Sequence, residues 1–446
     1  MGSSGINLSQ TSATQGAGID VTSIVDQIIF TEQAPERIWQ QQQLALAAQT
    51  SSLNSLSSGV NALKAKVLAL SDLTGVFSSQ LATSSLPGLA TVSAQSNAAA
   101  GVHTLVIDHL ATVSSYYTDP VTDSSTALAH GTLTLSGGQG TNLITIDSSN
   151  DTLDKLSTYI NAHNYGVKAS VINDSSGARL ALVSTTSGLP GDLGVTLNNT
   201  GLVFHKSADG INAGFSLDAV PLSSTTNTVS SPVPGVTLNL LAASPGTPIT
   251  ISVGPDTAAI TQAINDFVSA YNSVIGSVNS QFKAGANSAA GPLASNSVLR
   301  SLQGSLLSDV AFSITGNNGV VNLASIGIDL QNDGTLSVDN SKLSTALSTQ
   351  FNDVKTFFQS GVSGSFGDHF SSDLTALTSP TSGALSLNLA ENVANQQNLA
   401  RQINSLEDRL VDRRQFLINQ YSQVDAMLRQ YPLILAQITG QLGSLK

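Results

Sequence analysis

The chain has 446 residues and a mass of 45.7 kDa, which predicts about three domains at roughly 150 residues each. Its 17 basic and 29 acidic residues give a net charge of −12, so we expect no nucleic-acid partner, because a phosphate backbone needs clustered basic residues. The absence of cysteine excludes disulfides, thiolate metal sites and cysteine nucleophiles. Neither a run of about 18 apolar residues nor a basic-then-apolar leader is present, so we expect no membrane insertion and no general secretory signal.

The first element expected is a long helix. From Asp20 to about Leu73 the apolar pattern is helical, and after Trp39 it becomes a heptad. Asp20 is a good helix N-cap, and Pro35 suits the start of a helix but not its interior. The heptad positions alternate three and four apart: Leu46, Gln49, Leu53, Leu56, Val60, Leu63, Val67 and Leu70. Because such a stripe is apolar, the helix is expected to lie on a partner.

The middle of the chain is expected to be rich in strands. The composition changes at residues 84–88, and from there to Gly254-Pro255 short alternating runs are separated by turn residues. The clearest unit, residues 131–188, is predicted to have two strands, a helix, and two strands joined by a turn at residues 174–177. Residues 88–253 carry 4 basic and 10 acidic residues, which predicts an acidic, solvated surface.

Helical periodicity returns at Asp256 and around residues 299–310, and these helices are expected to cover the first one. One further helix is expected to carry five apolar positions, Leu343, Leu347, Phe351, Val354 and Phe358.

A β-hairpin is expected over residues 326–338, with Asn332-Asp333-Gly334 as its turn. The same segment, counted from Asp329, also resembles a calcium-binding loop. Gln331 and Asn340 stand where that loop needs its third and twelfth ligands, and Asn340 cannot supply a bidentate carboxylate. The plain hairpin is therefore favoured.

A second heptad-like helix is expected from about Leu389 to the C-terminus. Its spacing slips by one residue near Arg413-Arg414, and Pro432 predicts a kink or break at Tyr431. Residues 401–446 hold 6 basic and 4 acidic residues, so this segment is opposite in charge to the rest. Its apolar positions are Leu399, Ile403, Leu406, Leu410, Leu417, Tyr421, Val424, Leu428, Tyr431, Leu435, Ile438, Leu442 and Leu445.

No catalytic or metal-binding motif is recognised. The histidines are His103, His109, His130, His163, His205 and His369, and no two have the His-Glu-x-x-His spacing of a helical metal site. A nucleophile elbow and a phosphate-binding loop are also missing from the sequence. We therefore expect no enzyme activity, no metal and no cofactor.

Together these patterns predict an α+β multidomain fold, in which N- and C-terminal segments form a helical, coiled-coil-like leg and a β-rich head of one or two domains is inserted between them. The expected parts are a flexible N-terminal segment (1–37), a leg domain with a hairpin (38–86 plus 255–388), a head domain (88–120 plus 200–253), an inserted head-tip domain (121–199) and a C-terminal coiled-coil-like helix (389–446). The candidate assembly interface is the set of apolar heptad positions Leu46, Leu53, Leu56, Val60, Leu63, Leu399, Ile403, Leu406, Leu410, Leu417, Tyr421, Val424, Leu428, Tyr431, Leu435, Ile438 and Leu442.

Several short motifs resemble one known family in the same order along the chain. Near the N-terminus they are Gly16–Val21, Ser23–Val25 and Glu32–Pro35; further on they are Phe267–Asn272, Gly291–Ala294, Ile326–Ile328 with Asp333–Leu336, and Val354–Phe358. They are similar to the signatures of the bacterial flagellar filament cap proteins, also called hook-associated protein 2. The unit at residues 131–188 is similar to a small βαβ-type repeat inserted in several flagellar axial proteins, so the resemblance implies a βαβ-type repeat in the head-tip domain (121–199).

The resemblance implies a structural protein without enzymatic activity. Several copies would form a ring-like homo-oligomer at the distal tip of the filament, where exported flagellin folds and is added. The implied partners are flagellin, the hook-filament junction proteins and a flagellar export chaperone on the C-terminal helix. The implied localisation is extracellular, at the flagellum tip, after passage through the flagellar export apparatus.

Two other classes of protein remain open from the sequence. A flagellin-like or hook-filament junction axial protein would share the helical termini. An extracellular adhesin or glycan-processing enzyme would use the β-rich head instead, and Asp151 and Asp154 are the nearest pair of carboxylates for such chemistry. These two acids precede or begin a predicted helix, where acidic residues are common without catalysis.

Overall fold

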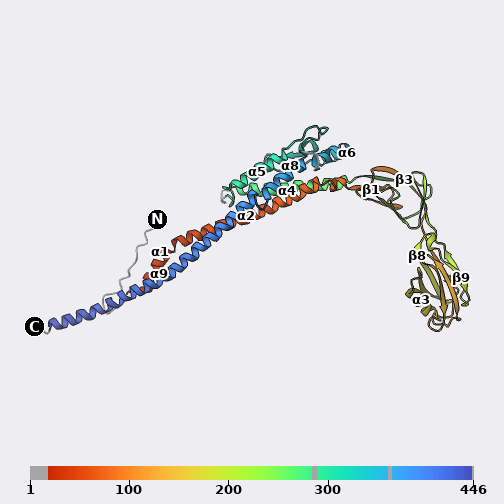
Figure 1. Ribbon diagram of the computed structural model, residues 1–446, viewed down its shortest axis with the longest axis horizontal. Helices are drawn as coiled ribbons and strands as arrows, with labels where there is room; N and C mark the ends of the chain where they lie inside the picture. Colours follow the sequence, from red (N-terminus) through yellow and green to blue (C-terminus); the bar gives the residue numbers. More distant parts are fainter. Residues whose placement is uncertain (1–18, 284–289, 360–363, 444–446) are drawn as a thin grey trace. The chain divides into compact units, whose positions relative to one another are not determined.

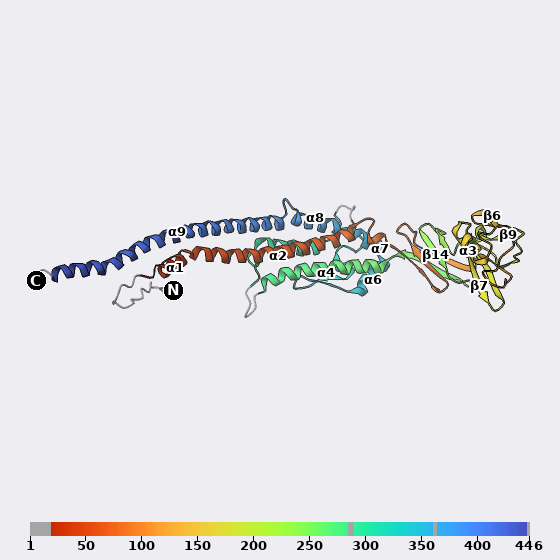
Figure 2. The same cartoon turned by 90° about the horizontal axis from the view of Figure 1, so that it is seen from below.

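The computed structural model describes residues 19–283, 290–359 and 364–443, which divide into two compact units (Figure 1, Figure 2). The helical unit comprises the chain up to Ser71 and from Thr261 onward, and the β-rich unit comprises Asp72–Ile260. This division confirms the expected fold class, in which helical N- and C-terminal segments enclose an inserted β-rich part.

The helical unit is built mainly from long helices. In chain order its helices are α1 (Val21–Glu32), α2 (Ala34–Ser71), α4 (Thr257–Phe282, from Thr261 on), α5 (Ser297–Val310), a 3₁₀ turn (Leu323–Ile326), α6 (Asn340–Thr349), α7 (Phe351–Phe358), α8 (Phe366–Thr378) and α9 (Ala384–Gly443). A two-stranded hairpin of β16 (Ile328–Leu330) and β17 (Leu336–Val338) follows the 3₁₀ turn.

The start of the first helices follows local chemistry. The Asp20 side chain accepts a hydrogen bond from the Ser23 amide and caps α1, as its residue type predicts. Gln33 separates α1 from α2, and Pro35 is the second residue of α2, where its missing N–H costs nothing. Six consecutive heptad positions of α2 are buried: Leu53, Leu56, Val60, Leu63, Val67 and Leu70. Helix α2 contacts α8 and α9, so the predicted partner of this helix comes from the same chain.

An aromatic cluster fills the core beside α2. Phe267 and Tyr271 of α4 meet Phe366 and Phe370 of α8, mostly edge to face, and Phe357 of α7 stacks on Phe366 with ring centres 5.1 Å apart. These rings are fully buried. Because each buries a large apolar surface, the cluster fixes α4, α7 and α8 against one another.

The expected hairpin is confirmed. Ile328 pairs with Val338 and Leu330 with Leu336, and Gly334 has a φ of +84°, which favours glycine in the turn. Asp333 accepts hydrogen bonds from the Thr335 amide and hydroxyl, so its carboxylate is used within the turn.

Three predictions about the helical unit are wrong in part. The helix expected to run from Leu343 to Phe358 is two helices, because Gln350 leaves the helical conformation at φ −132° and ψ 34°. No break occurs at Tyr431, since α9 continues through Pro432. Part of the segment expected to be flexible at 1–37 is helical: residues 21–32 form α1, which contacts α9 (Figure 1).

The β-rich unit contains two cores, each formed between antiparallel sheets. Around the first core lie β1 (Gln80–Ser84), β15 (Ile249–Pro255), β3 (Gly101–His109), β11 (Ala213–Leu217) and β12 (Val220–Ser224), in that order in one sheet, and β13 (Thr228–Ser230), β14 (Val236–Leu240) and β2 (Ala90–Ala94) in another. A 3₁₀ turn at Val76–Ser78 precedes β1. Leu105, Ile107, Phe215, Leu238 and Ile251 are buried together between these sheets.

The second core lies between two further sheets and one helix. One sheet has the order β10 (Phe204–Ala208), β4 (Val113–Thr118), β8 (Gly177–Ser187), β7 (Val167–Asp174), and the other the order β6 (Gly140–Ile146), β5 (Gly131–Gly137), β9 (Gly194–Asn198). Helix α3 (Leu153–Ala162) supplies Leu153, Leu156 and Ile160 to this core, and a 3₁₀ turn at Leu189–Gly191 follows β8.

The strands and helix predicted within residues 131–188 are all present, but they do not form a βαβ repeat. A βαβ unit pairs its two strands in parallel. Here β6 and β7, on either side of α3, belong to different sheets, and each pairs antiparallel with its hairpin neighbour.

The boundaries expected within this part of the chain also differ from the sheets. Strand β1, expected in the leg, pairs with β15 in the β-rich unit. Strands β4 and β10, expected in the head domain, pair with each other, and β4 pairs with β8 beside the second core. Single short strands carry too little pattern to reveal which sheet they join, because pairing is decided by partners far away in sequence.

Three asparagine side chains each bind both the N–H and the C=O of a single residue in a strand or just after one. Asn161 of α3 accepts from the Ala169 amide and donates to the Ala169 carbonyl of β7, an outer strand, at 2.9 and 2.7 Å. Asn272 of α4 does the same to Leu336 of β17, at 2.7 and 2.8 Å. Asn227 accepts from the amide of Ala111, which follows β3, at 2.7 Å and donates to the Ala111 carbonyl at 2.9 Å.

Candidate functional site

The candidate assembly residues fall into a buried set and an exposed set. On α2, Leu53, Leu56, Val60 and Leu63 are buried, and on α9 the residues Ile403, Leu406, Leu410 and Leu417 are buried as well. These residues belong to the helical unit, in which α2 and α9 contact each other (Figure 2). They are therefore covered by the chain itself.

Two predicted residues, Leu46 and Leu399, are only half-buried. They line a groove where α2 and α9 lie beside each other, together with Trp39, Gln49, Gln402 and Arg409. The side chains do not close over this part of the helix pair.

In addition to the buried apolar residues, polar contacts join α1 to α9. Arg414 of α9 lies 2.7 Å from Asp26 of α1, and Arg413 lies 3.4 Å from Glu32. The Ile19 amide, just before α1, donates to the Asp425 side chain at 2.8 Å. The two arginines at which the heptad spacing slips therefore form ion pairs between α9 and α1.

The last turns of α9 carry the exposed set. We call Val424, Leu428, Tyr431, Leu435, Ile438 and Leu442 the C-terminal stripe; these side chains are between 41% and 64% exposed, and Tyr421 just before them is half-buried. At 100° per residue all six fall within a narrow sector of the helix surface. Scattered exposed apolar residues are ordinary, whereas a continuous exposed stripe is a common feature of interaction surfaces.

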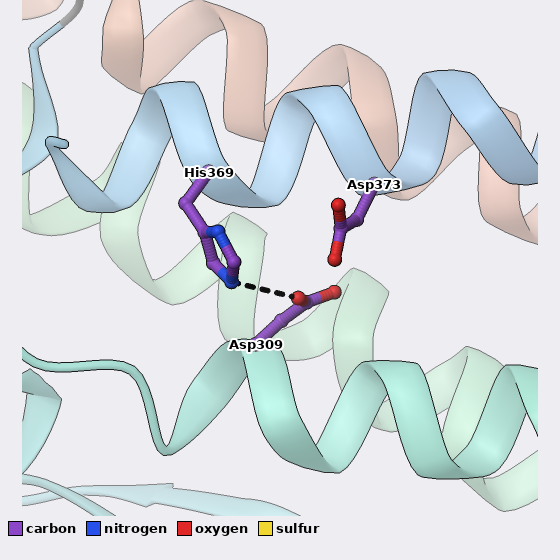
Figure 3. Close-up of side chains that lie close together, drawn as sticks. All are labelled: Asp309, His369 and Asp373. Carbon is purple, nitrogen blue, oxygen red and sulfur yellow. Dashed lines mark ion pairs between the residues drawn. The ribbon is translucent and has the colours of Figure 1, made fainter. Parts of the chain in front are cut away.

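A cluster of ionisable side chains, absent from the sequence predictions, lies elsewhere in the helical unit (Figure 3). Asp309 is in the last turn of α5, and His369 and Asp373 are four residues apart on α8, so both point toward Asp309. His369 Nε2 lies 3.4 Å from an oxygen of Asp309. The His369 ring also stacks on Phe312, with ring centres 4.2 Å apart.

Burial dominates the electrostatics of this cluster. The Asp309 side chain is completely buried, whereas His369 and Asp373 are partly exposed. Burial raises the pKa of Asp309 to about 8, and the neighbouring Asp373 carboxyl adds to the rise. Burial, and to a lesser degree the charge of Asp309, also raises the pKa of the Tyr271 hydroxyl. The sequence signal for this cluster was the four-residue spacing of His369 and Asp373, but Asp309 is distant in the chain.

Among the helices that the structure describes, none is both long and apolar enough to cross a membrane.

Comparison with known proteins points to one family. Sequence models described as the N-terminus and the C-terminus of flagellar hook-associated protein 2 match residues 17–114 and 210–432, and the flagellin hook IN motif matches residues 132–186. The chain is 29% identical to the B-type flagellar hook-associated protein 2 of Pseudomonas aeruginosa over 469 aligned positions, covering 96% of both chains. It is 28% identical to flagellar hook-associated protein 2 of Escherichia coli strain K12 over 461 positions, again covering 96% of both.

A solved structure agrees with these relatives. The crystal structure of the D1-D2-D3 domains of the flagellar cap protein FliD from Escherichia coli matches with a TM-score of 0.57 and 28% identity. The match covers 77% of this chain and 99% of that one.

Proposed function

This chain belongs to the flagellar hook-associated protein 2 family, and on that basis we propose that it is a structural cap at the distal tip of the bacterial flagellar filament. There it promotes the folding and insertion of exported flagellin subunits. Similarity over nearly the full length of its relatives, together with the likeness to a solved flagellar cap protein, supports this role. It works as a scaffold and not as an enzyme, like the proteins it resembles.

The observation that carries the mechanism is the C-terminal stripe. The chain covers the apolar seam of α9 as far as Leu417 with its own helices but leaves the stripe exposed. Burying each large apolar side chain is worth about 1.5 to 3 kcal/mol, so the stripe has ample capacity to bind another helix. Copies of the chain associate through it into a ring-like homo-oligomer, and the half-buried Leu46 and Leu399 extend the same interface along the helix pair.

Other partners follow from this placement. The cap contacts flagellin and the hook-filament junction proteins at the filament. Before assembly the exposed stripe is a binding site for a flagellar export chaperone, because an apolar helix face needs cover until its partners are present. The chain is secreted through the flagellar export apparatus and acts outside the cell.

Introducing two negative charges tests the stripe. In cells that lack their own cap protein, the chain carrying Val424→Asp and Leu428→Asp should fail to support filaments, because two carboxylates would have to be desolvated in the interface. We expect flagellin monomer in the medium and loss of swimming. Thermal unfolding of the β-rich unit should be unchanged, since that unit does not contain these residues.

The matched control adds the same two charges to the same part of α9. Ser422 and Gln437 are exposed and lie about half a turn away from the stripe. The variant with Ser422→Asp and Gln437→Asp should keep normal filaments. Normal filaments with the first variant would remove the stripe from the mechanism. Electron microscopy of the purified wild type addresses the cap itself: plate-like rings support it, while filaments or only compact monomers contradict it.

A further inference from the structure

The cluster of Asp309, His369 and Asp373 presents three metal-binding groups to one point (Figure 3). One ligand atom from each residue can be chosen so that all three lie within 4.8 Å of one another. Ligands around a tetrahedral zinc ion, bound at about 2.0 to 2.2 Å, are separated by about 3.4 Å. Small changes in side-chain rotation would therefore bring the three groups around one ion.

Asp309 supplies a second, independent observation. Its side chain is completely buried, and neither carboxylate oxygen has a hydrogen-bond partner among the described residues. Buried carboxyl groups are normally hydrogen-bonded, paired or bound to a metal, because a buried polar group without a partner is costly. The His369 ring lies at 3.4 Å, in ion-pair range, without making a hydrogen bond that satisfies Asp309. The carboxylate thus points into the cluster with its acceptors unused.

The chemistry of the donors selects the kind of cation. An ion that binds here displaces the carboxyl protons, and the resulting two carboxylates and one neutral imidazole carry a charge of −2, which a divalent ion neutralises. Imidazole favours zinc, copper, nickel and iron, whereas magnesium and calcium favour oxygen ligands alone. His369 and Asp373 are partly exposed, so an ion can enter from solvent and keep water in its remaining coordination position.

We propose that Asp309, His369 and Asp373 bind one divalent transition-metal ion, with Zn²⁺ the best match to one nitrogen and two oxygen ligands. The ion would connect the end of α5 to the middle of α8, two helices that contact each other in the helical unit. Because the three ligands are brought together only by folding, the metal binds the folded chain and stabilises it. The site is separate from the C-terminal stripe and does not depend on the proposed cap function.

The test uses the full-length protein after removal of metal with a chelator, and Zn²⁺ alone as the probe. Equilibrium dialysis followed by metal analysis should find one zinc ion per wild-type chain. Thermal unfolding followed by calorimetry or circular dichroism should show a higher unfolding temperature of the helical unit with zinc. Co²⁺ in place of Zn²⁺ should give the visible absorption of a low-symmetry site. Asp309→Asn and His369→Gln should each lose the bound ion, the cobalt spectrum and the temperature shift.

The control removes an imidazole that sits beside a carboxylate elsewhere. His103 Nδ1 lies 2.7 Å from Asp218 in the β-rich unit, so His103→Gln tests whether any exposed His–Asp pair binds zinc. This variant should bind zinc like the wild type. If Asp309→Asn does not fold, His369→Gln and Asp373→Asn give the answer, because both positions are partly exposed. A wild type that binds no stoichiometric zinc, or folded His369→Gln that binds it equally well, overturns the proposal.

Discussion

Asp26 of α1 and Arg414 of α9 form an ion pair with an N–O distance of 2.7 Å, although 388 positions separate them in the chain. A second pair joins Glu32 and Arg413. Exposed ion pairs contribute only about 0 to 1 kcal/mol each, so they do not hold the two ends together by themselves. They match one turn of α1 to one turn of α9, and the burial of Val25 contributes more to stability.

Limited proteolysis should show where α9 stops being protected. Leu417 is the last buried residue among the side chains of α9 that the structure describes, and residues 426–442 are exposed. A protease in mild conditions should therefore cut α9 after about Asp425 and spare residues 384–417, as read by mass spectrometry of the fragments. Leu406→Ala should move cleavage toward the middle of the helix, because deleting a buried leucine costs about 2 to 5 kcal/mol. Early cleavage near Leu389 in the wild type would contradict the packing of α9 on α2.

Gly367 should not tolerate a side chain. A Cβ built at this position of α8 would lie 2.6 Å from Cβ of Ser71, the last residue of α2, and would also meet the Phe358 carbonyl. Gly367→Ala should lower the free energy of unfolding of the helical unit by about 1 to 3 kcal/mol, measured by denaturant titration.

The control for this substitution is Gly276→Ala in α4, where an added Cβ meets no atom within 4 Å. Alanine is better than glycine in a helix interior by about 0.8 to 1.0 kcal/mol, so this variant should be neutral or slightly stabilised. Equal losses in both variants would show that close packing at Gly367 is not the cause.

The Tyr271 ring and its hydroxyl should have opposite effects on stability. The residue is fully buried in the aromatic cluster, and its hydroxyl has no hydrogen-bond partner among the described residues. Tyr271→Phe removes an unsatisfied polar group and should leave the free energy of unfolding unchanged or raise it by about 1 kcal/mol. Tyr271→Ala should lower it by about 3 to 5 kcal/mol. The free energy of unfolding of both variants is measured with a metal chelator present. A clearly lower value for Tyr271→Phe than for the wild type would mean that the hydroxyl has a hydrogen-bond partner.

Asp192 should make the β-rich unit sensitive to acid. Burial alone would raise the pKa of Asp192, but hydrogen bonds from Lys206, the Gly210 amide and Ser114 outweigh it and hold the pKa below the usual value. The folded state then binds fewer protons than the unfolded state in acid. Its contribution to stability is present above about pH 4 and is lost as the pH falls through the lowered pKa.

Thermal unfolding of the wild type and of Asp192→Asn over a pH series tests this. The difference in unfolding temperature between them should be largest near neutral pH and shrink in acid. A constant difference across the series would show that the ionisation of Asp192 does not contribute.

The helices of the fold were largely predictable, because their stripes are local. The heptad of α2 appears in the structure as six consecutive buried positions, and the N-cap at Asp20 is confirmed. The end of α6 was not predictable, because Gln350 interrupts the helix without the glycine or proline that usually marks such a point. At Pro432 the expected break is absent for the opposite reason: a proline was present and the helix continued.

The candidate sites were predicted less well than the helices. Heptad spacing identifies apolar faces but does not say which chain covers them, so the buried Leu53 and the exposed Leu428 had the same signature. The Asp309 cluster depends on α5 meeting α8, and that contact leaves no pattern in the sequence. Only the His369 and Asp373 spacing could have drawn attention to it.

The asparagines that bind strand backbones have a consequence for many copies held side by side. An outer strand offers unpaired N–H and C=O groups, on which a strand of another molecule can add. Asn161 and Asn272 occupy such groups at Ala169 and Leu336 with both a donor and an acceptor. Each side-chain amide thus makes the two hydrogen bonds that a residue of a neighbouring strand would make at that position. At these two points a strand from another copy would find no free N–H or C=O group to pair with.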